Sequence, residues 1–324
     1  MSNAGRALAH AFDTGALVPE RAFFLRAEPG PFRNTDAEQS FRPVYLRLRQ
    51  AGWSVVPRIQ SGTWDLGHLL LTKHKEENFA NIARAWALLA DNGVLVCAGA
   101  NDDGAASIEK QVGKAFGLVG TLSKHHCRVF WLARGDREPP DYWRELAALK
   151  PVGDGSWLSQ PGIFSWDRID DGSALLARHL PDDLAGQVAD FGCGWGYLSR
   201  EILGRSIAVS GIDLIDAEHL AIEAARANVT DPRASFHWLD LAQEPAPAAY
   251  DAIVCNPPFH AGRAAEPGLG QTMIAAAARA LKPAGRLYMV ANRGLPYEAQ
   301  LKAHFASFET LADNNKFRVS LATR

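Results

Sequence analysis

Residues 188–196 read Val-Ala-Asp-Phe-Gly-Cys-Gly-Trp-Gly, a short apolar run that leads into three alternating glycines. An apolar run followed by a glycine-rich turn is typical of a buried strand that passes directly into a helix. Gly192 and Gly194 let the chain turn tightly and let a ligand approach backbone that a Cβ would cover. The stretch therefore predicts an α/β fold with a ligand site at the end of this strand.

From this point on, strand patterns alternate with helix patterns. Strands are expected at Val188–Phe191, Ala208–Leu214, Ser235–Leu239, Asp251–Cys255 and Arg286–Ala291, then at Phe308–Leu311 and Phe317–Ala322 around the turn-rich Asp313-Asn314-Asn315. Helices are expected at Tyr197–Leu203, Ala217–Asn228 and Gln271–Leu281. The pattern predicts a mostly parallel, seven-stranded Rossmann-like sheet with helices on both faces and an antiparallel hairpin at one edge.

The first half of the chain repeats this pattern more weakly. At a constant offset of 192, Ala85, Leu89, Gly93, Leu95, Phe116 and Lys124 match Ala277, Leu281, Gly285, Leu287, Phe308 and Lys316. A two-residue slip then aligns Arg128-Val129 and Arg134 with Arg318-Val319 and Arg324, and Trp64-Asp65 resembles Tyr250-Asp251. The alternative is that a helix–glycine–strand pattern recurs by chance. We interpret the pattern as two tandem copies of one fold, residues 1–150 and 151–324, of which the first is degenerate.

Composition narrows the class of protein. The 324 residues are 47% apolar and 22% charged, which excludes a disordered or collagen-like chain, and Lys+Arg 34 against Asp+Glu 36 argues against a strongly basic coat protein. Residues 1–150 hold 19 basic and 16 acidic residues (+3), and residues 151–324 hold 15 and 20 (−5). The four cysteines lie far apart, without metal-ligand spacing, so neither a disulfide framework nor a metal site is expected. Without an apolar signal or spanning segment, the sequence predicts a cytoplasmic protein with no membrane partner.

Acidic residues are expected at the ends of the next two strands. Asp213 lies 21 residues after Gly192, where a carboxylate can accept both ribose hydroxyls, and Asp240 is placed to meet an adenine amino group. Either residue alone could be a solvated strand-end acid. Tyr197 stands where the dinucleotide fingerprint has its third glycine, so the loop suits the methionine end of S-adenosylmethionine better than NAD.

The segment Asn256-Pro257-Pro258-Phe259 follows the fourth expected strand. Two prolines stop the strand and hold the backbone extended, so the Asn256 side-chain oxygen and the Pro257 carbonyl can both accept hydrogen bonds from a ligand. An exocyclic amine is a poor nucleophile, because its lone pair is delocalised, and two acceptors that hold its hydrogens can aim that lone pair at a methyl donor. Phe259 offers a flat face on which a planar group can stack. A rigid turn after the strand is the alternative interpretation.

These motifs resemble those of class I S-adenosylmethionine-dependent methyltransferases, and in detail those of the RsmC/RlmG-type ribosomal RNA guanine-N2 methyltransferases. The resemblance rests on Pro161-Gly162-Ile163-Phe164-Ser165, Gly172-Ser173 with Leu175-Leu176, Asn256–His260, Val290-Ala291-Asn292 with Leu295-Pro296-Tyr297, and Lys316–Val319. It covers residues 159–324 strongly and residues 1–150 weakly.

The resemblance implies transfer of one methyl group to guanine N2 of ribosomal RNA in the small subunit, with S-adenosylhomocysteine as product and no metal. Residues 151–324 would be the catalytic domain, and residues 1–150 would recognise RNA or stabilise their neighbour. The implied cofactor contacts are Asp190, Gly192 and Gly194 at the methionine end, Asp213 at the ribose, Asp240 near adenine, and Phe164, which closes the pocket. Asn256 and Pro257 would hold the target amine, and Phe259 would stack on the flipped guanine.

Other functions stay open from the sequence. Methylation of a protein glutamine at N5 poses the same chemical problem, and adenine-N6 methylation is a third enzyme class. A non-catalytic RNA-binding or assembly protein could retain the fold. The expected partner is ribosomal RNA or a ribosomal subunit, and the expected state is a monomer. Arg263, Arg293, Lys316 and Arg318 come from segments that could converge into a phosphate-binding patch.

Overall fold

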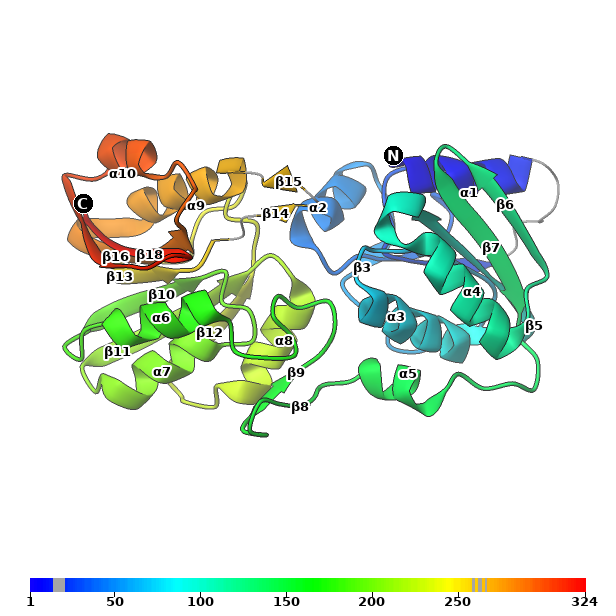
Figure 1. The fold of residues 1–324 in the computed structure, drawn as a ribbon, viewed down its shortest axis with the longest axis horizontal. Coiled ribbons are helices and arrows are strands. Elements are labelled where there is room, and N and C mark those ends of the chain that lie inside the picture. Colours follow the sequence, from blue (N-terminus) through cyan, green and yellow to red (C-terminus); the bar gives the residue numbers. More distant parts are fainter. Residues whose placement is uncertain (14–20, 258–259, 262–263, 266) are drawn as a thin grey trace. The chain divides into compact units, whose positions relative to one another are not determined.

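The chain folds into two compact units, each built around its own seven-stranded sheet (Figure 1). The computed structural model describes residues 1–13, 21–257, 260–261, 264–265 and 267–324, without the side chains of 260, 261, 264, 265 and 267. The first unit comprises Met1–Lys150 and Gln160–Gly162, and the second comprises Pro151–Ser159 and Ile163–Arg324.

The second unit has the expected sheet. Its strands are β10 (Gly186–Phe191), β11 (Val209–Asp216), β12 (Ala234–Trp238), β13 (Tyr250–Cys255), β16 (Leu281–Asn292), β17 (Ser307–Asp313) and β18 (Phe317–Thr323). They lie in the order β12-β11-β10-β13-β16-β18-β17. The first five pair in parallel, whereas β18 pairs antiparallel with both β16 and β17. The predicted α/β fold class with an antiparallel edge hairpin is confirmed.

Helices cover both faces of this sheet. The helices α6 (Asp171–His179), α7 (Tyr197–Arg205) and α8 (His219–Asn228) lie on one face, and α9 (Pro267–Ala280) and α10 (Glu298–His304) lie on the other (Figure 1). Alternate strand residues supply the two cores, so that Val188 and Leu214 pack toward α6–α8 while Ala189 and Ile215 pack toward α9 and α10. Two small ribbons, β8 (Lys150–Val152) with β9 (Trp157–Ser159) and β14 (His260–Ala261) with β15 (Ala264–Ala265), complete the described elements.

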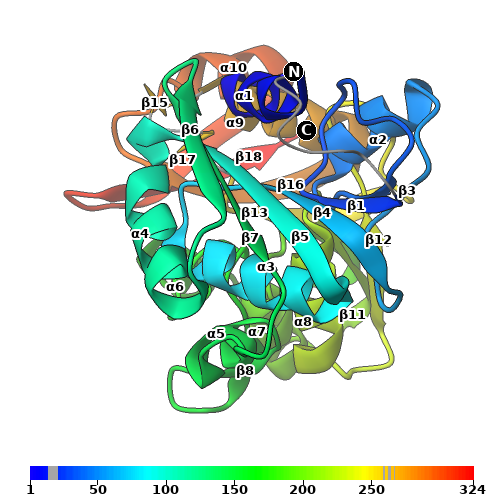
Figure 2. The same ribbon diagram turned by 90° about the vertical axis from the view of Figure 1, so that its right-hand side faces the viewer.

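The first unit has the same strand arrangement. Its strands are β1 (Ala22–Leu25), β2 (Asp36–Glu38), β3 (Val55–Val56), β4 (Trp64–Leu70), β5 (Leu89–Ala100), β6 (Gly120–Lys124) and β7 (Cys127–Ala133), in the order β3-β2-β1-β4-β5-β7-β6. Its helices are α1 (Asn3–Asp13), α2 (Arg42–Gln50), α3 (Lys75–Leu88), the 3-10 turn η1 (Asn101–Asp103), α4 (Ala105–Phe116) and α5 (Asp141–Leu146). Figure 2 shows α1 and α3 on opposite sides of the sheet.

The two units match in detail as well as in topology. The helix α3 and the strand β5 have 14 and 12 residues, as do α9 and β16 at the offset of 192. Trp64 pairs with Leu89 ahead of a register shift, and Tyr250 pairs with Leu281 ahead of the same shift. Arg134 and Arg324 both donate from the guanidinium to the carbonyl of the residue that begins the long strand. The chain therefore contains two tandem Rossmann-like domains.

Two of the sequence matches between the halves are wrong. Phe116 ends α4, whereas Phe308 lies in β17. Lys124 pairs with Cys127 inside the β6–β7 ribbon, whereas Lys316 lies in the turn before β18. The α4 and α10 regions differ in length, so one offset cannot hold across them.

A buried ion pair anchors the edge of the first sheet. Glu38, at the end of β2, is 5% exposed, and its two carboxylate oxygens accept hydrogen bonds of 2.7 and 2.6 Å from the Arg84 guanidinium of α3. The backbone N–H of Ile59 donates to the same carboxylate at 2.6 Å. A buried carboxylate is tolerated only when such partners replace its water.

We expect Arg84→Ala to destabilise the first unit by about 3–5 kcal/mol, because the substitution leaves the Glu38 carboxylate buried without its cation. Urea unfolding followed by tryptophan fluorescence measures the change. Arg49→Ala, at an exposed position of α2, is the control and should shift stability by less than about 0.5 kcal/mol. Equal effects of the two substitutions would contradict this account of the pair.

Candidate functional site

The glycine loop joins β10 to α7 at the carboxyl edge of the second sheet. Gly192 and Gly194 have φ values of 75° and 53°, which side chains with a Cβ rarely adopt. The backbone N–H groups of Gly192 and Cys193 both donate to the carbonyl of Ile215, at 2.8 and 3.1 Å. A Cβ on Gly192 would lie 3.4 Å from the Met273 methyl group and 3.9 Å from the Asn256 carbonyl oxygen. The loop therefore lies directly beside the end of β13.

Two carboxylates, one fully buried and one half-buried, lie at this loop. Asp190 is fully buried in β10, and its Oδ2 accepts a hydrogen bond of 2.7 Å from the Ser199 hydroxyl, while Oδ1 has no partner in the described part of the chain. Burial, with a smaller contribution from the nearby Asp216 carboxylate and against the hydrogen bonds of Ser199, raises the pKa of Asp190 to about 7. Burial also raises the pKa of Asp216, although backbone N–H groups of Glu218 and Gly194 oppose the shift. Such a pair favours a cationic ligand.

The strand end expected at Asp213 is wrong. The strand β11 continues to Asp216, whose Oδ2 accepts a hydrogen bond of 2.9 Å from the Gly194 N–H. Asp213 instead points to the opposite face of the sheet, where its carboxylate binds the Tyr250 hydroxyl at 2.7 Å and His237 Nε2 at 3.2 Å. Residues three apart in a strand face opposite sides, so only one of these two acids can reach the loop. The structure brings Asp216 there.

Asp240 follows β12 and organises a turn. Its Oδ1 accepts from the Ala242 N–H at 3.0 Å, and its Oδ2 accepts from the Gln243 side chain at 2.6 Å. It is 6% exposed and does not line the hollow described below. These contacts are those of a structural carboxylate, and a role near adenine stays a prediction.

Asn256 directly follows β13 and is held by the start of α6. Its Nδ2 donates to Asp170 Oδ2 at 2.9 Å and to Ser173 Oγ at 2.8 Å. Asp170 is also the N-cap of α6, because the same oxygen accepts from the Ser173 N–H at 2.8 Å. Sequence reasoning missed both partners as site residues, although Asp170-Asp171-Gly172-Ser173 carries an N-cap signal.

These segments enclose one hollow of about 400 Å³ that is open to solvent. Its lining consists of Phe164, Ser165, Asp170, Ser173, Gly192, Cys193, Gly194, Trp195, Tyr197, Leu198 and Asn256, all from the second unit. We call it the glycine-loop hollow. The structure thus brings Gly192, Gly194, Asn256 and Phe164 together, with Asp190 buried beneath the loop. Phe164 is 56% exposed, and Pro257 is buried. Pro258 and the expected stacking residue Phe259 lie outside the described residues.

Trp195, in the glycine loop, is a large side chain that lines the hollow without closing it. It is 4% exposed and packs edge-on against Trp157 of β9, with ring centroids 5.0 Å apart. Asn228 fastens this arrangement, because its Nδ2 donates at 2.8 Å to the carbonyls of both Trp195 and Leu158. The β8–β9 ribbon thus accommodates the large ring.

The basic residues expected at the carboxyl edge carry acidic partners. Arg293 and Arg318 both pair with Asp313, at 3.3 and 3.1 Å, and Lys316 pairs with Asp171 at 3.7 Å. Arg263 lies outside the described residues. The three described cations therefore form a charge-balanced cluster and not a bare phosphate patch.

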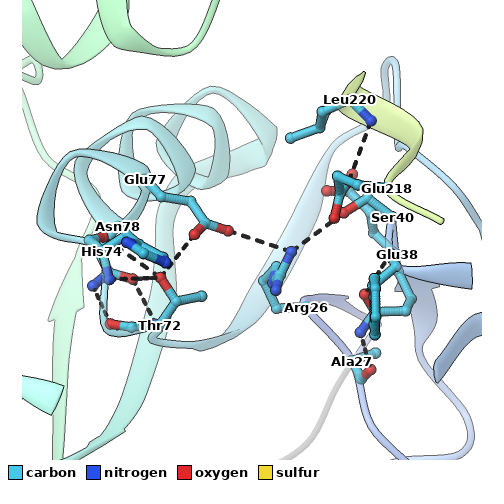
Figure 3. A network of polar contacts seen from close by, with 12 residues as sticks. Arg26, Ala27, Glu38, Ser40, Thr72, His74, Glu77, Asn78, Glu218 and Leu220 are labelled. Carbon is cyan, nitrogen blue, oxygen red and sulfur yellow. Dashed lines mark hydrogen bonds and ion pairs between the residues drawn. The ribbon is translucent and has the colours of Figure 1, made fainter. Parts of the chain in front are cut away.

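The first unit carries different residues at the positions that match the glycine loop and Asn256. In matching register, Arg26, Phe24 and Leu70 take the places of Gly192, Asp190 and Asn256. Arg26 even keeps a positive φ of 58°. Its guanidinium lies 3.3 Å from both the Glu77 carboxylate and the Ser40 hydroxyl, and Thr72 donates to Glu77 at 2.9 Å (Figure 3). The ion-paired side chain of Arg26 thus occupies the position at which the second unit has a glycine with exposed backbone.

Comparisons with known proteins agree with this geometry. Residues 155–320 match the family model "Methyltransferase small domain". A "Ribosomal RNA small subunit methyltransferase C" of Pseudomonas aeruginosa is 33% identical over 82% of this chain and 81% of its own length. The chain belongs to this methyltransferase family. A second member, from Hahella chejuensis, is 34% identical over 70% of this chain and 68% of its own.

A solved structure shares the whole two-domain fold of this methyltransferase. It is a T. thermophilus 16S rRNA N2 G1207 methyltransferase (RsmC) in complex with AdoMet and guanosine, with a TM-score of 0.80 and 21% identity. The alignment covers 100% of this chain and 92% of that one. Within the described residues of the methyltransferase, no group of His, Cys, Asp and Glu could hold a metal ion. No described helix is long and apolar enough to cross a membrane.

The raised pKa of Asp190 predicts a pH-dependent gain in stability for Asp190→Asn. Between the unfolded pKa near 4 and the folded value near 7, the native state binds the extra proton, so Asp190 progressively lowers stability as pH rises. The isosteric amide removes this cost and still accepts from Ser199. We expect the variant to gain on the order of a few kcal/mol at pH 8 and much less at pH 5, measured by urea unfolding.

Asp251→Asn is a control of opposite sign. The Lys282 ammonium, 2.8 Å away, holds the pKa of Asp251 below its ordinary value. Its stabilising contribution is therefore present above the unfolded pKa and is lost as pH falls through the folded one. The control should lose stability at pH 8. A pH-independent effect of Asp190→Asn would contradict the assignment of a buried carboxylate.

Proposed function

We propose that this chain transfers a methyl group from S-adenosylmethionine to the exocyclic N2 of a guanine in small-subunit ribosomal RNA. The observation that carries the proposal is that the glycine loop and the Asn256 amide line one hollow, with the Asp190 and Asp216 carboxylates at that loop. The family membership and the names of the relatives support the reaction and the substrate.

The residues of the hollow fit S-adenosylmethionine. The backbone of Gly192 and Gly194 leaves space that a Cβ would fill, and Asp190 keeps an unpaired buried oxygen beneath it. The described lining contains Asp170 and Asn256 but neither Lys nor Arg, so its charge suits a cation. In this proposal Asp190, Gly192 and Gly194 hold the methionine end, Asp216 takes the ribose role expected of Asp213, and Phe164 covers the mouth.

When bound, S-adenosylmethionine supplies an electrophilic methyl group on a positively charged sulfur. The chain must then align the amine and favour the geometry in which the amine lone pair is available. The Oδ1 atom of Asn256 and the Pro257 carbonyl accept hydrogen bonds from the two N–H groups of the guanine amine. These oxygens also stabilise the positive charge that develops on the nitrogen. The amine proton becomes acidic only as the new bond forms, so a strong base is not required.

Positioning provides most of the rate enhancement in this proposal. Alignment of two bound reactants can lower a barrier by roughly 7–11 kcal/mol. The rigid supports are the strand ends themselves, together with the N-cap of α6 that holds Asn256. Phe259 is proposed to stack on the guanine once that base has left its helix. The proposal also includes a monomer that acts in the cytoplasm, where its RNA substrate is found.

Transfer of a radiolabelled methyl group tests the substrate. Purified protein is incubated with labelled S-adenosylmethionine and with small ribosomal subunits, large subunits, free ribosomal RNA or total protein, and the products are digested to nucleosides. We expect N2-methylguanosine from small-subunit RNA, first at the position equivalent to G1207. Label in glutamine or in N6-methyladenosine would replace the proposal, and the absence of label from every arm would favour a non-catalytic assembly protein.

Asn256→Ala separates binding from chemistry in the same assay. The variant should bind S-adenosylmethionine within about threefold of wild type in calorimetry, yet transfer methyl groups at least about 100-fold more slowly. Loss of binding in proportion to loss of transfer would show that Asn256 holds the cofactor and not the amine.

Exchange of the matched residues of the two units tests which unit binds the cofactor. Gly192→Arg introduces the side chain that the first unit carries as Arg26, and it should abolish S-adenosylmethionine binding. The reciprocal Arg26→Gly should keep one bound cofactor per chain in calorimetry, because Phe24 and Leu70 still replace Asp190 and Asn256. A stoichiometry of two in Arg26→Gly, or binding by Gly192→Arg, would refute this assignment.

A further inference from the structure

The amide of Asn256 has one unusual constraint. A side-chain amide carries an oxygen and an NH2 group of nearly equal size, so either can face a ligand unless other contacts decide. Here Nδ2 lies 2.9 Å from a carboxylate oxygen of Asp170 and 2.8 Å from Ser173 Oγ. An ionised carboxylate only accepts hydrogen bonds, so the NH2 group must face Asp170.

The opposite side of the amide is thereby determined. With both Nδ2 hydrogens directed to Asp170 and Ser173, Oδ1 faces away from α6, and it has no hydrogen bond to any described residue. An oxygen accepts from an amine, whereas an NH2 group in its place would oppose the two amine hydrogens. Reversal of the amide would therefore convert an acceptor into a donor at the point where the target nitrogen must be held.

We propose that Asp170 and Ser173 are positioning residues that hold the Asn256 amide with its oxygen toward the target amine. The inference rests on the proposed methyl transfer. The N-terminus of α6 then has two roles, because the same atom, Asp170 Oδ2, caps the helix and orients the amide. The helix cap makes this acceptor rigid, since Asp170 cannot rotate away without losing its bond to the Ser173 N–H.

A reciprocal exchange tests the proposal. Asn256→Asp alone sets two carboxylates against each other and should lower kcat by at least about 100-fold, and Asp170→Asn alone should lower it about 10-fold by allowing the amide to reverse. In the double variant, the new amide at position 170 can donate to the new carboxylate at position 256, which still presents an oxygen to the amine. Asparagine also caps helices well. We expect the double variant to exceed Asn256→Asp in kcat by at least about tenfold.

A second comparison needs only the removal of one hydroxyl. Ser173→Ala deletes an acceptor of the amide but keeps the backbone N–H that the helix cap uses. Ser206→Ala is the matched control, because Ser206 lies outside the lining of the hollow and its hydroxyl donates to the Asp182 carbonyl at 3.3 Å. We expect Ser173→Ala to lower kcat several-fold without a change in KM for S-adenosylmethionine, and Ser206→Ala to leave kcat unchanged.

The outcomes separate this inference from the proposed function. If wild type transfers no methyl group to RNA, the function itself fails. If wild type is active, a double variant no faster than Asn256→Asp overturns the positioning role, provided that thermal melting shows it folded. Should the double variant not fold, Ser173→Ala decides: equal kcat for Ser173→Ala and Ser206→Ala overturns the proposal. A parallel rise in cofactor KM would instead assign Asp170 and Ser173 to cofactor contact.

Discussion

Burial of the Asp190 carboxylate is the constraint around which the second unit is organised. A carboxylate in the middle of a sheet loses its water, and here, among the described residues, only one of its two oxygens regains a partner, Ser199. The fold tolerates the free-energy cost of this burial because β10, α7 and the glycine loop enclose the carboxylate. The loop exposes its own backbone above it. A cationic ligand at the loop would supply the missing partner. In the proposed function, stability and ligand affinity therefore depend on the same carboxylate, in opposite directions.

The first unit shows what the same fold becomes without this constraint. Its strand order and its long central strand are those of the second unit, yet Phe24 replaces the buried acid and Arg26 fills the turn. A fold built on apolar strands tolerates this, because Phe24 packs into the core of the first unit. The ion pair of Arg26 with Glu77 replaces a ligand with an internal partner. Two copies of one architecture thus differ chiefly at the carboxyl edge of the sheet.

The sequence predicted the fold and part of the site, and its errors have physical causes. The glycine loop and Asn256 were found because each follows a buried strand directly, so local pattern alone placed them. The strand end was misplaced at Asp213 because Asp213 and Asp216 both follow apolar residues in one strand, and it is Asp216 that lies at the loop. Asp170 was missed as a partner of Asn256 since 86 residues separate them in the chain. Only the packing of α6 against the sheet reveals that contact.

Net charge was the least informative property of the sequence, and the structure explains why. Residues 151–324 carry an acidic excess, yet several of these acids have partners within the protein itself. Asp190 and Asp216 lie at the glycine loop, and Asp313 neutralises two arginines at the carboxyl edge. A polyanion approaching that edge can exchange with Asp313 for the same guanidinium groups, at a cost that salt concentration would modulate. The affinity of such an enzyme for RNA therefore depends on which carboxylates its basic side chains must separate from in order to bind a phosphate. The net charge does not contain that information.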